Sequence, residues 1–532
     1  MFILPDLSAT MESAVPATVA TLANHGAVDL DALLRQAEGL LVQSRTVVLW
    51  TYYLALGSLS LLGLHRLHLL VIAHRSQRAT AREAPVGVAL EAEPPTVLVQ
   101  LPLFNERSVA ARLIDACAQF DYPKDRFQIQ VLDDSTDNTS QVVAERVAHW
   151  QRLGIEIEHL RRRERAGYKA GALQAGLRET TSDLVAVFDA DFDPDPDFLR
   201  RLVPRFGDSE VGMVQARWDY ANRSDTLLNE VQALLLDGHF LIEHQARAAK
   251  GAFFNFNGTA GIWRRTAIDD GGGWQHDTVT EDLDLSYRAQ LAGWRFEYAG
   301  AVGVRSDLPE TLAAYRGQQR RWTKGSAQTL RKLSRPILRS PIGWRRKVEA
   351  FAHLGANLGY PLTVLVALLL PLVITIRHLG FEPEMLRYDL TMLLFGTASV
   401  CAFYLGAARQ RGLSLLRGIF LLPALLALCM GLAWHNAKAC LDGLRAQGGV
   451  FERTPKGDYR PRRPFPWGES LLTLYLGCAL LALASAGAWV GLPFLALFVV
   501  GFASTASVLW RRQKPVPSRS ETVAPVEGLV DR

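Results

Sequence analysis

Two carboxylates, Asp189 and Asp191, follow the apolar run 184–188 directly. This run has the length and composition of a buried strand, so both side chains are expected at its tip. Carboxylate oxygens are hard ligands for Mg²⁺ or Mn²⁺, and such an ion could neutralise a diphosphate leaving group. The alternative is a solvated acidic turn, because a segment rich in Pro and Asp follows at 193–197.

A second acidic pair, Asp133 and Asp134, follows the run 127–132 in the same way. Acidic residues at strand ends hydrogen-bond the ribose or the base edge in nucleotide-binding folds, which is the first interpretation. The alternative is a cluster that caps the next helix, since Asp, Ser, Thr and Asn are favoured at helix N-termini. The pair alone does not decide between them.

The third motif is Thr280-Glu281-Asp282, which precedes a predicted helix. A base that takes the proton of an acceptor hydroxyl needs a carboxylate within hydrogen-bond reach, and a desolvated pocket raises its affinity for that proton. We expect Asp282 to be this base, with Glu281 as its neighbour in a catalytic pair. The rival interpretation is a capping box or a first-turn partner of the helix dipole.

The fourth motif, Gln318-x-x-Arg321-Trp322, combines an amide, a guanidinium and an indole. The guanidinium suits a phosphate, and the indole face suits a sugar ring. An amphipathic interfacial helix would explain the basic residues of 316–324, but it does not require these three side chains at this spacing. In this order, with apolar segments on both sides, the four motifs predict an enzyme that handles a nucleotide diphosphate at a membrane.

The segment that must position these motifs, 95–345, alternates between strand and helix patterns. This alternation predicts a doubly wound α/β sheet, in which ligands bind at the carboxyl ends of strands. A helix should follow Asn105 and end at about 119. The predicted strands are 97–101, 127–132, 155–160 and 184–188.

Composition indicates a soluble domain joined to membrane segments. Among 532 residues, 49% are hydrophobic and 21% are charged, with a mean hydropathy of +0.07. The net charge of +5 is modest, and Arg residues gather beside apolar runs, which favours an anionic membrane surface over nucleic acid. The five cysteines are far apart, so neither a disulfide framework nor a structural zinc is expected.

Several other side chains have weaker indications of function. His239 and His244 lie in an apolar stretch with no third ligand nearby, so we expect them to be structural rather than metal ligands. Trp218 and Trp274 would either line a sugar channel or pack in the core.

The membrane segments follow from run length and the placement of Lys and Arg. The uncharged run 46–64, within a segment predicted as 46–73, has spanning length and is followed by arginines. The tail 1–45 is therefore expected outside and the domain that follows in the cytoplasm. Further predicted spans lie within 351–408 and 471–510, as the runs 351–376, 390–408, 471–488 and 492–510.

The apolar stretch 413–436 conflicts with this topology. If it spanned, the basic loop after it would lie outside, against the positive-inside bias. Because Arg417 and Pro423 interrupt the stretch, we expect 413–440 to be an interfacial helix. This leaves five crossings, a cytoplasmic loop at 441–470, and a Pro-rich basic tail at 511–532 that is expected to be disordered.

Five segments resemble the plant cellulose-synthase-like A group. They are VLVQLPLFNER at 97–107, GYKAGAL at 167–173, FNGTAGIWR at 256–264, LPE at 308–310 and YR at 315–316. That group comprises glucomannan 4-beta-mannosyltransferases of the inverting glycosyltransferase family 2. The resemblance implies a GT-A fold, here a doubly wound mixed sheet in a cytoplasmic catalytic domain, joined to an α-helical transmembrane bundle.

The resemblance also implies roles for residues of the four motifs. Asp133, with Asp134, and Lys169 would contact the nucleotide, and Asp191 would hold Mg²⁺ or Mn²⁺ with the help of Asp189. Asp282 would be the general base. Gln318, Arg321 and Trp322 would bind the diphosphate and the acceptor end of a polysaccharide.

A later segment is similar to the gating loop of bacterial cellulose synthase. The shared residues are Phe451, Thr454 and Lys456, whereas Arg453 and Pro455 depart from that pattern. The resemblance implies an α-linked nucleotide-diphosphate donor, GDP-mannose or UDP-glucose, a β-linked product, and export through the bundle.

Two other functions remain open at this stage. The same core could transfer one sugar to a lipid or polyprenyl carrier, or the chain could be a noncatalytic membrane subunit or transporter. The expected partners are a nucleotide-sugar donor, a polysaccharide acceptor and the lipid bilayer, without nucleic acid. The expected location is a plasma, inner or Golgi-type membrane.

Overall fold

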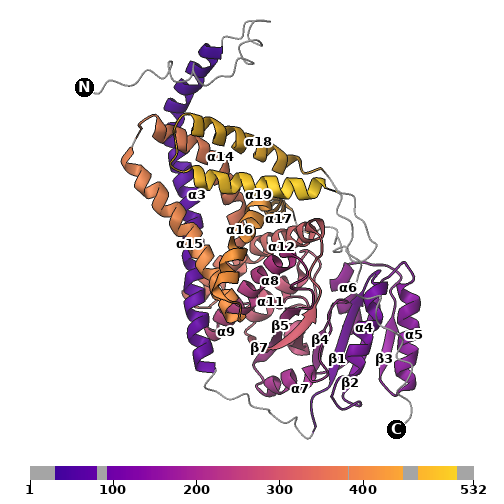
Figure 1. Cartoon of the computed structure of the whole chain (residues 1–532). Helices are drawn as coiled ribbons and strands as arrows, with labels where there is room; N and C mark the ends of the chain where they lie inside the picture. Colours follow the sequence, from indigo (N-terminus) through magenta and orange to yellow (C-terminus); the bar gives the residue numbers. More distant parts are fainter. Residues whose placement is uncertain (1–29, 81–92, 382, 447, 449–464, 512–532) are drawn as a thin grey trace.

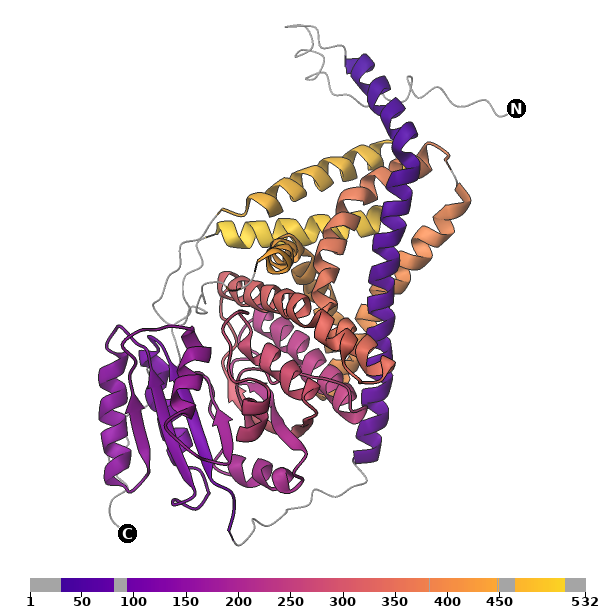
Figure 2. The same cartoon turned by 180° about the vertical axis from the view of Figure 1, so that it is seen from behind.

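The computed structural model describes residues 30–80, 93–381, 383–446, 448 and 465–511. A domain built on one β-sheet lies beside a bundle of long helices, and the first helix runs along the side of both (Figures 1 and 2). The predicted gating loop at Phe451, Thr454 and Lys456 and the tail at 512–532 lie outside the described residues.

Seven strands form one mixed sheet in the order β3-β2-β1-β4-β6-β5-β7. The first four strands are parallel, β6 is antiparallel to both β4 and β5, and β5 is parallel to β7. All four predicted strands are present. The strands are β1 (Val97–Leu103), β2 (Phe127–Asp133), β3 (Ile157–Leu160), β4 (Leu184–Val187), β5 (Val211–Tyr220), β6 (Gly261–Arg264) and β7 (Arg295–Ser306).

Alternate residues of the central strands fill two different cores. Val97 and Val99 of β1 belong to one buried cluster, whereas Leu98 belongs to the other. This period of two places helices on both faces of the sheet, as the doubly wound pattern predicts. The expected doubly wound sheet is confirmed, with antiparallel β6 as an addition that the sequence pattern did not predict.

The helices of this domain connect the strands and continue toward the bundle. They are α4 (Arg107–Ala118), α5 (Thr139–Arg152), α6 (Tyr168–Leu177), α7 (Phe198–Leu202), η2 (Val203–Gly207), α8 (Leu227–Asp237), η3 (Gly238–His244), α9 (Gln245–Ala249), α10 (Arg265–Asp270), α11 (Glu281–Leu291), α12 (Leu312–Arg339) and α13 (Trp344–Leu354). The η3 segment is a π-helical turn inside a longer helical stretch. Helix α12 extends beneath the bundle (Figure 2) and packs against α17 (Ala433–Arg445).

Five helices among the described residues are long and apolar enough to cross a membrane. They are α3 (Leu30–Thr80), α14 (Gly359–His378) with the short turn η4 (Ala356–Leu358) before it, α15 (Leu386–Gln410), which follows η5 (Pro383–Met385), α18 (Trp467–Ser485) and α19 (Leu492–Trp510). Each overlaps one predicted run, although α3 begins well before position 46, 351–354 belongs to α13, and α18 ends before 486–488. Boundaries differ because packing, in addition to hydropathy, decides where a helix begins and ends.

The stretch predicted as a single interfacial helix at 413–440 consists of two helices. Helix α16 (Leu415–Gly431) and helix α17 are bent by 46° at a short break, and the pair would form a sixth span if it crossed as one unit. Arg417 and Pro423 interrupt the apolar stretch in sequence, but α16 continues through both residues, and the interfacial placement stays a prediction. Arg417 instead donates to Glu230 of α8 at 3.0 Å, which joins α16 to the sheet domain.

Candidate active site

The carboxyl ends of β1, β2 and β4 meet at one edge of the sheet. Leu103, the last residue of β1, pairs with Asp133, the last residue of β2, and the Asp134 amide donates to the Leu103 carbonyl at 3.0 Å. Phe188 follows β4 and donates to the Gln100 carbonyl of β1 at 3.1 Å. The first two acidic motifs therefore lie at the same edge, as the parallel arrangement predicts.

The Asp133 carboxylate is enclosed at this edge, with 0% of its side chain exposed. Its oxygens accept hydrogen bonds from the Ser135 amide at 2.8 Å, the Ser140 hydroxyl at 2.5 Å and His159 at 2.9 Å. Burial opposes its ionisation, but these bonds outweigh burial and lower the pKa of Asp133. The predicted nucleotide contact remains a prediction, and here Asp133 organises the loop after β2.

A cationic rim lies next to this loop. Arg162 donates from Nε to Asp134 Oδ1 at 3.0 Å, and the Arg165 guanidinium lies 3.5 Å from the ring centroid of Phe104. Phe104 directly follows β1. Stacked planar groups and guanidinium donors at the end of a strand are suited to a base and its phosphates.

Lys169 lies at the centre of the edge. Its Nζ donates to Asp189 Oδ1 at 2.6 Å and to the Gly258 carbonyl at 2.7 Å. Burial opposes the charged ammonium, but the carboxylates of Asp189, Glu281 and Asp282 outweigh burial and raise the pKa of Lys169. This lysine therefore joins Asp189 to the loop before β6 and to the third motif.

The third motif begins α11 and faces the same centre. A Cβ on Gly258 would lie 3.0 Å from Asp282 Oδ2 and 3.4 Å from the ammonium of Lys169. Burial and the neighbouring Glu281 carboxylate raise the pKa of Asp282 to about 7, against the lowering effect of Lys169. Burial also raises the pKa of Glu281, although Lys169 and Arg321 oppose it. Such a carboxyl can take up a proton near neutral pH.

Asp189 and Asp191 offer two carboxylates for a divalent cation. The Asp189 side chain is 37% exposed, so oxygen atoms next to Lys169 remain accessible. No cluster of three or more His, Cys, Asp or Glu side chains suited to a metal occurs in the part of the chain that the structure describes. The donor set fits an ion that takes two carboxylates from the protein and its other oxygens from phosphate and water.

Helix α12 divides the fourth motif between two faces. Gln319 and Trp322, three residues apart, line a cavity, whereas Arg321 lies close enough to Glu281 to lower its pKa. The Gln318 Oε1 atom is buried with no hydrogen-bond partner among the described residues. The Trp322 ring centroid lies 6.4 Å from that of Trp218 in β5.

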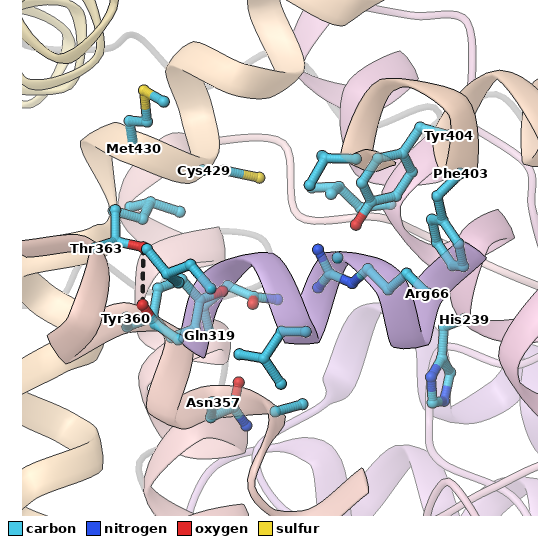
Figure 3. A pocket seen from close by; sticks show the side chains of 18 of the residues that line it. Arg66, His239, Gln319, Asn357, Tyr360, Thr363, Phe403, Tyr404, Cys429 and Met430 are labelled. Carbon is cyan, nitrogen blue, oxygen red and sulfur yellow. Dashed lines mark hydrogen bonds between the residues drawn. The ribbon is translucent and has the colours of Figure 1, made fainter. Parts of the chain in front are cut away.

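A cavity of about 500 Å³ extends from Asp282 and Trp322 into the helical bundle. Trp218 lines this cavity, whereas Trp274 is buried in the core, and a sugar-binding role for Trp218 stays a prediction. His239 also lines the cavity (Figure 3), and its ring nitrogens lie 3.4 Å from Glu243 Oε2 and 2.9 Å from Asn257 Nδ2. His244 is buried and pairs with Asn257 at 2.7 Å, as expected for a structural residue.

The sequence profile of the glycosyltransferase-like family 2 matches residues 94–325. The probable glucomannan 4-beta-mannosyltransferase 9 of Oryza sativa subsp. japonica is 37% identical over 368 residues, which cover 67% of each chain. The chain belongs to the family 2 glycosyltransferases. Its mixed sheet is the GT-A fold that the resemblance implies.

A second curated relative agrees with this family assignment. Glucomannan 4-beta-mannosyltransferase 2 of Arabidopsis thaliana is 47% identical over 251 residues, or 46% of this chain and 47% of the relative. This glycosyltransferase thus spans about half the length of the first curated relatives it matches. A mannosyltransferase from Pyrobaculum calidifontis, solved with GDP-mannose and Mn²⁺, aligns with a TM-score of 0.47 and 22% identity over 67% of this chain and 98% of its own.

Sequence reasoning missed some residues that complete the centre. Gly258 has a φ of +82° and brings its carbonyl to Lys169, while the Thr259 hydroxyl accepts from the Asp189 amide at 2.9 Å. Both residues belong to the FNGTAGIWR segment. That segment carried the family resemblance, but neither residue was assigned a role in the site. Gly325 of α12 lies against Thr280, where a Cβ would be 2.3 Å from the Thr280 side chain. One-dimensional patterns do not reveal such close approaches.

Proposed function

We propose that this glycosyltransferase transfers a mannosyl residue from a nucleotide-diphosphate sugar to the end of a β-linked polysaccharide. The observation that carries this proposal is the cavity, because it joins the Asp282 carboxyl and the Trp322 ring to the helical bundle. An acceptor in the cavity would present its terminal hydroxyl to Asp282. The glucomannan mannosyltransferases among its relatives support mannose as the transferred sugar.

The reaction would be a single in-line displacement. Asp282 accepts the proton of the acceptor hydroxyl as that oxygen bonds to the anomeric carbon of the sugar. The bond from that carbon to the diphosphate oxygen breaks, and the nucleotide diphosphate leaves with the electron pair. An α-linked donor thereby gives a β-linked product. Lys169 and Arg321 supply positive charge near the departing group.

Asp189 and Asp191 would hold Mg²⁺ or Mn²⁺. A bound ion supplies positive charge that stabilises the diphosphate. Lys169 shares the Asp189 carboxylate, so it keeps this side chain oriented. The Asp134–Arg162 pair and the Arg165–Phe104 stack form the rim that would receive the nucleotide.

The five spanning helices support a membrane enzyme whose catalytic domain faces the cytoplasm, where nucleotide sugars are made. In this arrangement the polysaccharide would enter the bundle as it grows. Beyond the end of α17 at Arg445, the Gly448 amide donates to the Asp277 carbonyl at 2.7 Å, three residues before the third motif.

The decisive experiment supplies the full chain in nanodiscs with radiolabelled GDP-mannose or UDP-glucose and with Mg²⁺ or Mn²⁺. The expected product is a water-soluble polymer from GDP-mannose that a β-1,4-mannanase digests. A single labelled sugar in the organic phase would favour a lipid carrier instead. Absence of nucleotide diphosphate release with every donor, from folded protein, would reject the proposal.

A further inference from the structure

A cationic side chain lies in the wall of the cavity within the spanning bundle. Arg66 of α3 projects into the space among the side chains labelled in Figure 3. The lining residues of α3 run from Leu56 to Arg66, and Arg66 is the last of them on the side of the catalytic domain. It is half-buried. The catalytic proposal gives this residue no role.

The Arg66 guanidinium makes no ion pair and no hydrogen bond with any described residue, and its Cζ lies 5.8 Å from the centroid of the Phe403 ring. Glu243 also lines the cavity, but its carboxylate is engaged by Arg247 at 3.2 Å and by His239 at 3.4 Å. The Glu243 carboxylate attracts the Arg66 charge at longer range but does not bond the guanidinium directly. A cation without a direct partner in a spanning helix is costly, and such residues face ligand pathways. Its donors are therefore available to a ligand in the cavity.

The surrounding side chains define the chemistry of that ligand. Arg66 is the only Lys or Arg among the described residues that line the cavity, whereas two carboxylates, Asp282 and Glu243, line it as well. One cation facing two acids is poorly suited to a strongly anionic ligand. Neutral hydrogen-bonding groups and aromatic rings make up much of the wall around it, including Gln319, Asn357, Tyr360, Thr363, Phe403 and Tyr404.

We infer that Arg66 binds hydroxyl groups of the nascent polysaccharide and thereby determines how long the product grows before release. The planar guanidinium presents several donors in a fixed fork, which can bridge neighbouring hydroxyls of a sugar ring. Aromatic rings such as Tyr404 and Phe403 can cover the apolar face of the same ring. This inference rests on the proposed function, because it requires the acceptor chain to occupy the cavity.

The position of Arg66 separates its role from the chemistry. Asp282 and Lys169 belong to the sheet domain, whereas Arg66 belongs to the first spanning helix. Loss of the guanidinium should therefore weaken retention of the chain without changing the transfer step. A charge-assisted hydrogen bond in a desolvated site contributes enough that its loss should weaken oligosaccharide binding about tenfold or more.

The test compares Arg66→Gln, Arg66→Lys and the control Arg75→Gln in full-length protein in nanodiscs. Arg75 is an exposed residue of the same helix. Binding of β-1,4-manno-oligosaccharides is measured by calorimetry, and product length and nucleotide release are measured with the active donor. For Arg66→Gln we expect about tenfold weaker oligosaccharide binding, shorter products, and nucleotide release at saturating acceptor within about twofold of the parent. Arg75→Gln should match the parent.

Parent-like binding and product length in Arg66→Gln would overturn the inference, and so would equal loss of transfer at every acceptor concentration. If Arg66→Gln does not fold, Arg66→Lys decides, because it keeps the charge and loses the fork. Parent-like oligosaccharide binding by that variant would then overturn the role of the fork. Parent enzyme that releases nucleotide but binds no oligosaccharide overturns this inference alone, whereas no release with any donor rejects the proposed function.

Discussion

The ammonium of Lys169 lies 2.6 Å from the carboxylate of Asp189 and also bonds the Gly258 carbonyl. One buried cation thus joins the carboxylate proposed for the metal to the loop that touches the proposed base. Lys169 also couples the Asp189 carboxylate to the protonation of Asp282, because its charge lowers the pKa of Asp282.

Replacement of Lys169 by Met should reduce kcat/KM about a hundredfold, since a preorganised charge at the departing group is lost. The pKa of Asp282 should also rise, because the opposing effect of Lys169 disappears. The pH at which activity is half-maximal should therefore move upward, in a pH–rate profile of nucleotide release. Lys250→Met, at an exposed position, is the matched control. An unshifted pH profile in Lys169→Met would contradict this coupling.

Asp282 should impose a lower pH limit on catalysis by the parent enzyme. Its pKa is raised to about 7, and a general base works only when it is deprotonated. The value of kcat/KM should therefore increase with pH through about 7. Asp282→Asn should lower kcat by about two to four orders of magnitude and remove this limb from any residual activity. Retained turnover with the same pH limb would exclude Asp282 as the base.

The same carboxyl should reduce stability at higher pH. Its pKa in the folded protein lies above the ordinary value of 3.8, so its contribution to stability is present at low pH and is lost as pH rises through about 7. Asp282→Asn removes the titrating carboxyl, so the variant does not lose this stability as pH rises. The Tm of the variant relative to the parent should therefore increase by a few degrees between pH 5 and pH 8. Asp125→Asn, where the side chain is 83% exposed, controls for the loss of one charge.

The strands and the edge that carries the acids could be predicted from the sequence for a physical reason. Buried parallel strands need continuous apolar runs, and the run 184–188 ends directly at Asp189. The chain reversal at β6 could not be predicted in the same way. Gly261 begins a strand of four residues whose place between β4 and β5 depends on pairing with residues far away in the sequence.

The enclosure of Asp133 and the orientation of Arg66 depend on tertiary contacts. His159, which bonds Asp133, lies on β3. The pairing of β2 with β3 brings the two side chains together. In the sequence Arg66 follows an apolar run, so it indicated only which end of that span faces the cytoplasm. Its direction into a cavity is fixed by the helices that pack against α3, which hydropathy does not encode.

Gly258→Ala should lower kcat strongly while it lowers the free energy of unfolding only slightly. The glycine has a φ of +82°, and an added Cβ would lie 3.0 Å from Asp282 Oδ2. Gly154 has a similar φ of +78°, but no described atom would lie within 4 Å of its Cβ. Both variants should lose about 1 kcal/mol of stability from the left-handed backbone. Only Gly258→Ala should lose kcat, by about tenfold or more, because Asp282 must move. Equal loss of kcat in the two variants would remove Gly258 from the site.

Gly325→Ala should disturb the third motif through helix α12. An added Cβ would lie 2.3 Å from the Thr280 side chain, so α12 and the start of α11 would have to separate. Gly317 lies on the same helix with no described atom within 4 Å of an added Cβ. Gly317→Ala should stabilise the protein by up to about 1 kcal/mol through helix propensity, with unchanged kcat.

Helix propensity also favours alanine at position 325. Helix propensity and packing against Thr280 therefore predict opposite changes in stability at this position. Overpacking of this kind costs about 1–3 kcal/mol, which exceeds the gain in propensity. Gly325→Ala should therefore lower Tm and raise KM for the acceptor, because Gln319 and Trp322 move with the helix. Thermal unfolding and acceptor titrations of both alanine variants provide the measurement. A Tm increase in Gly325→Ala equal to that of Gly317→Ala would show that Thr280 yields to the new methyl group and that the close approach does not position the motif.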